Sequence, residues 1–144
     1  MRGIDLLSNF QADILTEVAV LNSDTDSTAV DLSAYRGCTF YALLGESADT
    51  LDGSNYIELE VEESTDNSTF TDAADGDIRN AVTGTNTGTF ALINAATEDQ
   101  LAYSTQYLGT KRYARVVINF TGTHTTGIPI TIFALRSVKN QLPV

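Results

Sequence analysis

The feature that most constrains the fold is the alternation of apolar and acidic residues in the segment YIELEVE, residues 56–62. A period of two places successive side chains on opposite faces of a β-strand. The apolar set is predicted to face a core and consists of Ile57, Leu59 and Val61. The acidic set is predicted to face water and consists of Glu58, Glu60 and Glu62. Polar residues 64–68 then predict a tight turn, after which Phe70 continues the apolar face in a second strand.

Short apolar or alternating runs continue this β pattern through the rest of the chain. They cover residues 14–21, 38–44, 89–93, 100–108, 112–120 and 128–135. The run at 38–44 is almost wholly apolar, which predicts a strand that is buried on both faces at the centre of a sheet. Pro129 near the start of the last run predicts an edge or entry position, because proline cannot donate to a sheet ladder.

The chain has 144 residues, a length that fits a single domain. About eight or nine strands joined by polar turns predict an all-β fold, a single-domain antiparallel β-sandwich or jelly roll. We assign residues 1–13 to a short N-terminal arm, residues 14–136 to the sandwich domain and residues 137–144 to a short basic tail. Residues 72–89 hold little apolar material and are predicted to form a long excursion.

Charge is distributed unevenly along the chain. The formal net charge is −11, yet residues 101–144 hold five basic residues and no acidic one. A surface with this acidic balance argues against nucleic acid or an anionic membrane as a partner, because phosphate groups are bound by Lys and Arg. No apolar run approaches the roughly 20 residues of a membrane span. Residues 1–5 also lack the apolar core of a signal peptide, so synthesis in the cytoplasm is expected.

Residue types that carry catalysis are scarce. His124 is the only histidine, and no serine is framed by the glycines of a nucleophile elbow. Cys38 is the only cysteine and lies in an apolar run, which favours a core residue over a reactive one. One histidine and one cysteine cannot build the common zinc sites. We therefore expect neither enzymatic activity nor a cofactor.

Calcium is the one metal for which oxygen ligands are abundant. Loop aspartates form two groups, Asp24 with Asp26, and Asp72 with Asp75 and Asp77. Their spacing does not match the twelve-residue calcium loop, so solvated turns are favoured over a metal site.

Two groups of residues are candidate contact elements. The apolar group in the arm would bind a partner or fold back onto its own domain, and it consists of Ile4, Leu6, Leu7 and Phe10. The basic group consists of Arg112, Arg115, Arg136 and Lys139. Antiparallel pairing of their two strands would bring these basic residues together. They would then be either solubilising charges that block unwanted strand addition or one half of an electrostatic contact.

Three segments resemble a known family. They are LEVEESTDNSTFTDAADGDI (residues 59–78), YLGTKRYARVVINFTGTHTTGIPI (107–130) and FALRSVKNQLPV (133–144). They resemble tailed-phage capsid decoration, or cement, proteins, small β-sandwich virion proteins encoded beside the major capsid protein. The resemblance implies a homotrimer on the outer surface of the head that binds the major capsid protein and bridges capsomers. The acidic insert at residues 46–55 departs from that pattern.

Two other functions remain open from the sequence. Similar hairpins occur in phage tail and baseplate modules, so a tail or head–tail connector protein is one alternative. A carbohydrate-binding module is the other, because tyrosines can stack on sugars. The candidate tyrosines are Tyr35, Tyr41, Tyr56, Tyr103, Tyr107 and Tyr113. The absence of tryptophan weakens that second alternative.

Overall fold

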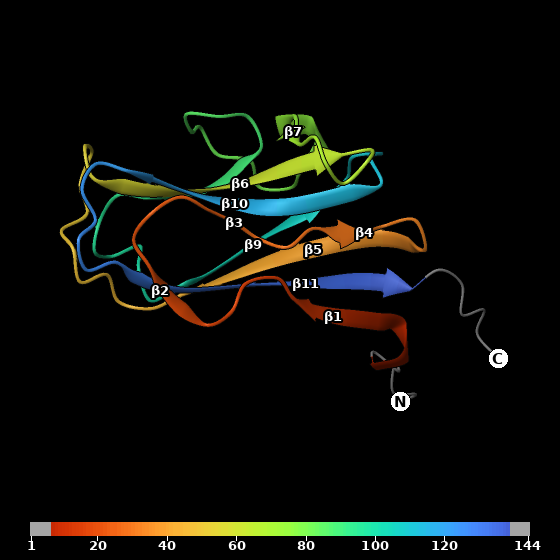
Figure 1. Cartoon of the computed structure of the whole chain (residues 1–144), viewed down its shortest axis with the longest axis horizontal. Coiled ribbons are helices and arrows are strands. Elements are labelled where there is room, and N and C mark those ends of the chain that lie inside the picture. Colours follow the sequence, from red (N-terminus) through yellow and green to blue (C-terminus); the bar gives the residue numbers. More distant parts are fainter. Residues whose placement is uncertain (1–6, 139–144) are drawn as a thin grey trace.

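The chain folds into two antiparallel sheets packed face to face, as Figure 1 shows for a computed structural model that describes residues 7–138. Sheet A contains β1 (Phe10–Ile14), β2 (Ala19–Leu21), β5 (Tyr35–Leu44), β9 (Ala102–Tyr107) and β11 (Ile128–Val138). Sheet B contains β3 (Thr25–Asp26), β4 (Val30–Asp31), β6 (Tyr56–Ser64), β7 (Thr71–Asp72), β8 (Thr89–Ile93) and β10 (Tyr113–Thr121). Two short 3-10 turns, η1 (Leu7–Asn9) and η2 (Asp75–Asp77), complete the described elements. The all-β sandwich predicted from the sequence is confirmed.

Long central strands organise each sheet. In sheet A the order is β1-β11-β5-β9, with β2 also paired to β11; in sheet B it is β3-β10-β6-β7, with β4 on β10 and β8 on β6. The predicted core residues of β6, Ile57, Leu59 and Val61, have no exposed surface. Phe40, Ile118 and Ile132 join them from β5, β10 and β11. Burial of each such side chain contributes about 1.5–3 kcal/mol, so the interior between the sheets holds the two layers together.

Several predicted strands differ in detail from the observed ones. β5 is central as predicted, but only alternate residues are buried, because the outer face of sheet A carries no covering layer of strands. Pro129 lies at the entry of β11, which is an inner strand and not an edge. The described part of the chain has 11 strands, more than predicted, because two-residue strands such as β3, β4 and β7 leave no periodic signal.

Residues 14–21 do not form the single strand that was predicted. β1 ends at Ile14, and the backbone amides of Leu15 and Thr16 both bond to the carbonyl of Ile132. This irregularity turns Leu15 into the core, and pairing with β11 resumes only at β2. Residues 10–13, assigned to the arm from the sequence, pair with β11 in the sheet, and Ser137 of the assigned tail is the partner of Phe10.

β10 and β11 do not pair with each other, contrary to prediction. β10 lies in sheet B against β6, while β11 lies in sheet A between β1 and β5. The two strands are consecutive in sequence, but the loop between them crosses from one sheet to the other. The basic residues that they carry therefore belong to different layers.

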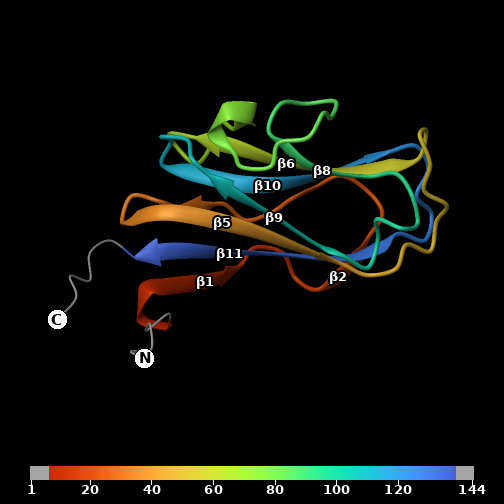
Figure 2. The same ribbon diagram turned by 180° about the vertical axis from the view of Figure 1, so that it is seen from behind.

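The outer face of sheet B is covered, which overturns the prediction that Glu58 and Glu60 face water. Both side chains are only 3% exposed. Residues 73–88 form the predicted excursion, which lies over β6 and β8 (Figure 2) and places the amide of Thr85 2.6 Å from Glu58 Oε1. Gly88 allows this close approach: its φ is +76°, and a Cβ there would lie 2.8 Å from the carbonyl oxygens of Val61 and Ala73.

Candidate contact surface on sheet A

Among the described residues, the outer face of sheet A is the main β surface that no other element covers. Because Ile130, Ile132 and Ala134 of β11 are buried in the core, the alternate residues of that strand point outward. The register then identifies the apolar outward residues of the neighbouring strands. We call this set the sheet A face: Phe10, Ala12, Ile14, Val20, Tyr41, Leu43, Ala102, Pro129, Phe133 and Leu135.

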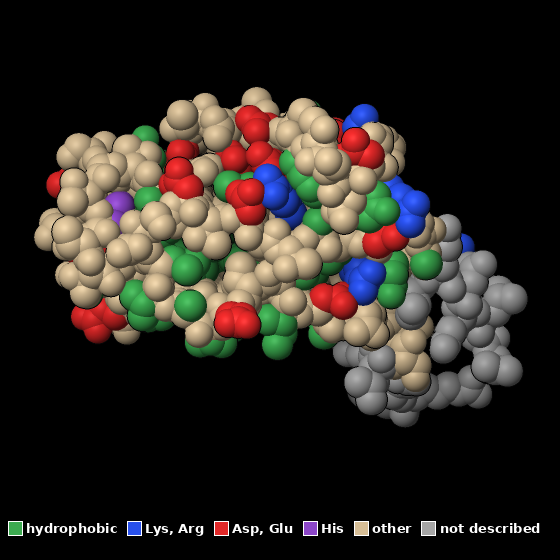
Figure 3. All heavy atoms as spheres, viewed as in Figure 1, with side chains coloured by type: hydrophobic (Ala, Val, Ile, Leu, Met, Phe, Trp, Pro, Cys, Tyr) green, Lys and Arg blue, Asp and Glu red, His purple; other side chains and the backbone are tan. Residues whose placement is uncertain are grey.

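The sheet A face is apolar and exposed. Ile14 is 76% exposed and Val20 62%, and Phe10 and Leu43 are each nearly half exposed. At its centre the rings of Tyr41 and Phe133 stack across β5 and β11, with centroids 4.9 Å apart and planes 8° apart. Figure 3 shows hydrophobic side chains along the lower edge of the molecule, where sheet A lies, with acidic side chains in places between them. A contiguous apolar surface of this kind usually marks an interaction site.

The outward positions in the regular register of sheet A hold no charged residue; the exposed Arg36 lies at the bulge near the start of β5. The remaining outward residues of its strands are small or polar: Gly37, Thr39, Ser104, Gln106, Thr131 and Ser137. The chain has 19 acidic residues, so their exclusion from a whole sheet face separates this surface from the rest of the molecule. Docking of an apolar partner here would leave no charge to desolvate, which removes the main cost of burying a protein surface.

Among the predicted apolar contact residues, Phe10 lies on the sheet A face, opposite Ser137 in the β1–β11 register. Leu7 begins the 3-10 turn η1 just before β1. Ile4, Leu6 and the basic residue Lys139 lie outside the described residues.

The three described arginines of the predicted contact set are bound within the molecule. Arg112 Nη2 lies 2.7 Å from Asp31 Oδ2, and the Arg112 guanidinium holds the pKa of the Asp31 carboxyl well below its usual range. Arg136 binds Asp13 at 2.7 Å, donates to the Asp31 carbonyl at 2.8 Å and lies 3.9 Å from the centroid of the Tyr35 ring. Arg112 and Arg136 thus meet at Asp31, although their strands belong to different sheets.

Arg115 joins three strands of sheet B. Its guanidinium nitrogens lie 2.6 Å from Glu62 and 2.7 Å from Asp26, and Arg115 Cζ lies 4.2 Å from the centre of the Phe70 ring. The sequence did not reveal these pairs, because the partners lie far apart in the chain. The separation is 53 residues for Arg115 and Glu62, 81 for Arg112 and Asp31, and 123 for Arg136 and Asp13. The three arginines therefore act as internal clamps between strands.

Cys38 and His124, the residues considered for catalysis or metal binding, both have structural roles. Cys38 is buried, and burial raises the pKa of its thiol to about 12. His124 is also buried; its Nε2 donates to the Thr121 carbonyl at 3.0 Å, and its ring packs edge-on against Phe120. Both residues thus fill the interior or brace a loop. Within residues 7–138, no helix is long and apolar enough to cross a membrane.

The aspartates considered as calcium ligands are separated in the fold. Asp24 Oδ1 accepts the Phe120 amide at 2.7 Å, and Asp26 pairs with Arg115. Asp75 Oδ1 accepts the Gly88 amide at 2.8 Å, which fixes the end of the excursion. Asp72 is directed instead toward Glu60 and Glu62 of β6, a grouping that no sequence spacing indicated.

The tyrosines do not form an open sugar-stacking platform. Arg136 lies over Tyr35, Arg112 lies 5.0 Å from the centre of the Tyr113 ring, and Tyr41 is stacked on Phe133. Tyr107 is buried, and its hydroxyl donates to Glu63 Oε2 at 2.5 Å. The aromatic faces are thus largely used within the molecule.

Comparison with known proteins adds no relative: no family model matches the chain, and no curated protein matches it.

Proposed function

We propose that this protein is a non-enzymatic structural protein of the phage virion, a capsid decoration protein that binds the outer surface of the head. The observation that carries the proposal is the charge-free apolar sheet A face on a chain of net charge −11. The resemblance of residues 59–78, 107–130 and 133–144 to cement proteins supplies the class. The buried environments of Cys38 and His124 support a role in which the protein does no chemistry.

The major capsid protein is the proposed occupant of the sheet A face. Free copies of the decoration protein repel one another through their net charge, which disfavours premature association in solution. An apolar strip on the capsid surface would meet no such repulsion at this face and would bury the exposed side chains of Ile14 and Val20. As in the family that the chain resembles, a homotrimer would multiply the contact through avidity.

A charge placed on the sheet A face tests the proposal. We expect Ile14→Lys to abolish binding of purified protein to heads that lack it, and to remove the gain in heat resistance that wild-type protein gives those heads. Val82→Lys is the matched control, because Val82 is exposed but lies in the excursion over sheet B. Equal binding by Ile14→Lys and wild type would overturn the proposal. Loss of a trimer in Ile14→Lys without capsid would instead assign the face to a second copy.

A tail or head–tail connector protein would use the same apolar face at a different place in the particle. Electron microscopy of purified virions distinguishes the two. Copies over the whole outer head surface support the decoration protein, whereas density confined to the tail or neck supports the alternative. A carbohydrate-binding module is disfavoured by the contacts that Tyr35, Tyr107 and Tyr113 make within the molecule, and glycan-array binding would be the result that revives it.

A further inference from the structure

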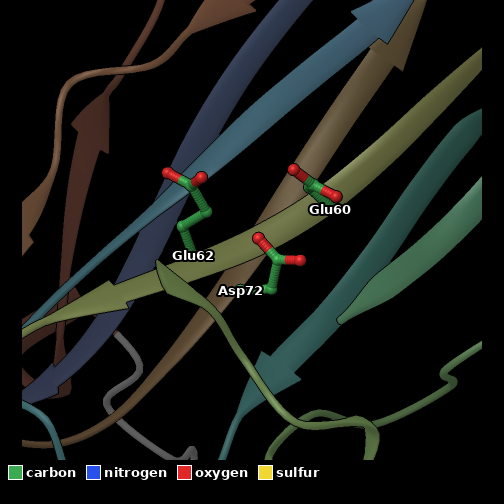
Figure 4. Close-up of side chains that lie close together, drawn as sticks. All are labelled: Glu60, Glu62 and Asp72. Atoms are coloured by element: carbon green, nitrogen blue, oxygen red, sulfur yellow. The ribbon is translucent and has the colours of Figure 1, made fainter. Parts of the chain in front are cut away.

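Three carboxylates meet on the outer face of sheet B. Glu60 and Glu62 lie two residues apart on β6, and Asp72 of β7 is the register partner of Glu62. One oxygen from each of the three lies within 4.8 Å of the other two. Figure 4 shows the carboxylates grouped over β6, with Asp72 facing the space between the two glutamates. Oxygens this close together can bind the same ion, because calcium holds its oxygen ligands at about 2.3–2.6 Å.

Glu60 is the buried member of the group, and one of its two carboxylate oxygens has no hydrogen-bond partner. Its side chain is 3% exposed, and its Oε2 accepts no hydrogen bond. The neighbouring Asn119 Nδ2 on β10 is also buried and donates to no acceptor. A buried carboxylate oxygen without a donor is costly, and a bound cation would satisfy it.

The local charge also favours a cation. Arg115 is shared between Glu62 and Asp26, so one guanidinium serves two carboxylates before Glu60 and Asp72 are counted. Without an ion, the three carboxylates lie close together with one guanidinium beside them.

We propose that Glu60, Glu62 and Asp72 form a calcium site that ties β7 to β6. The proposed ligands are all carboxylate oxygens, which suit hard cations and not zinc or copper. Calcium fits better than magnesium, because calcium accepts an irregular shell of carboxylate and water oxygens and magnesium demands a near-ideal octahedron. Asp72 is exposed and provides the route by which the ion enters. The inference does not depend on the proposed function.

Calorimetric titration with CaCl₂, together with thermal unfolding in EDTA and in about 5 mM CaCl₂, tests the site at a concentration above the Kd of weak calcium modules. We expect one ion per chain and a rise in Tm of roughly 3–5 °C. MgCl₂ at the same concentration should give a smaller rise. Glu60→Gln and Asp72→Asn should each lose most of the calcium-dependent rise; Asp72→Asn alters an exposed side chain and so leaves the core intact.

Glu46→Gln is the matched control, because Glu46 is exposed in the loop after β5, away from the cluster. It should retain the full calcium response. No binding heat and no Tm rise in the wild type would overturn the proposal. An equal calcium response in wild type, Asp72→Asn and Glu60→Gln would overturn it as well, since the ion would then bind elsewhere.

Discussion

Cys38 lies midway along β5 with its side chain in the core, where only 1% of its surface is exposed. A thiolate needs water or a nearby positive charge, and burial outweighs the opposing effect of Arg136, raising the thiol pKa to about 12. The sulfur is therefore protonated and inaccessible in the folded protein. The same residue-level cause acts on Glu60, where burial favours the neutral carboxyl.

We predict that Cys38 does not react with a disulfide reagent such as DTNB in the native protein near pH 8, since the reagent requires an exposed thiolate. Addition of guanidinium chloride should release one thiol per chain. Ser104→Cys provides the control: Ser104 is exposed on the outer side of β9, so its thiol should react at once without denaturant. A native wild-type reaction as fast as that of the control would contradict the prediction.

At the scale of elements, period-two patterns predicted the strands that face the core but not what covers their other side. The alternation in β6 correctly separated Ile57 and Leu59 from Glu58 and Glu60. It could not reveal that residues 73–88 return over the acidic side, because their polar composition is that of a solvated loop. The sheet A face was missed for the opposite reason: its apolar side chains have the pattern of core residues, and only the strand order shows that no strand within residues 7–138 lies over them.

The ion pairs at strand ends were also beyond sequence reasoning, since each joins elements far apart in the chain. Arg136 is the clearest example. From β11 it binds Asp13 of β1, the carbonyl of Asp31 of β4 and the ring of Tyr35. It thereby links the edge of sheet A to a strand of sheet B, and its side chain is only 13% exposed. Removal of the guanidinium would leave Asp13 without its partner.

We predict that Arg136→Met lowers the free energy of unfolding by about 1–3 kcal/mol, because methionine keeps the apolar stem but leaves buried acceptors unsatisfied. Urea unfolding followed by circular dichroism measures the change. Arg79→Met is the matched control at an exposed position, with an expected effect within about 0.5 kcal/mol. Equal midpoints for the two variants would show that the Arg136 contacts contribute no more than a surface arginine does.

At the scale of the whole molecule, the sandwich presents two unlike outer faces. Sheet A exposes an apolar surface without charge, and sheet B encloses carboxylates beneath an excursion. Acidic residues elsewhere act mainly as hydrogen-bond acceptors in loops. Asp49, for example, accepts the Gly127 amide at 2.6 Å and the Thr126 amide at 3.1 Å, which joins two loops at one end of the sandwich. The acidic residues that give the net charge of −11 fall into two groups, whose titration changes the stability in opposite directions.

Four aspartates are stabilised in the ionised form. Their pKa values lie below the ordinary 3.8: Arg112 has this effect on Asp31, and backbone amides, chiefly those of Gly127, Ser54 and Thr69, have it on Asp49, Asp52 and Asp66. The unfolded chain binds protons to these groups more readily than the folded protein does. Their contribution to stability is therefore complete above the unfolded pKa and is lost as pH falls through the lower folded values.

The titration of Glu60 affects stability in the opposite direction, because burial raises its pKa above the ordinary 4.5. Below its unfolded pKa, Glu60 is protonated in both the folded and the unfolded protein, so it does not change the stability. As pH rises through the higher folded pKa, the buried carboxyl loses its proton and the free energy of unfolding falls.

We therefore predict that Tm in EDTA is highest at mildly acidic pH and falls on both sides. In Glu60→Gln the fall toward neutral and alkaline pH should be smaller, and the fall toward acid should remain. Calorimetric scans from about pH 3 to about pH 8 test this, with Glu46→Gln as the control that should keep the wild-type profile. Glu60 is the expected cause of this fall, because it is a buried carboxyl on the covered face of sheet B and its Oε2 accepts no hydrogen bond. Identical profiles for wild type and Glu60→Gln above about pH 5 would show that another group causes the fall.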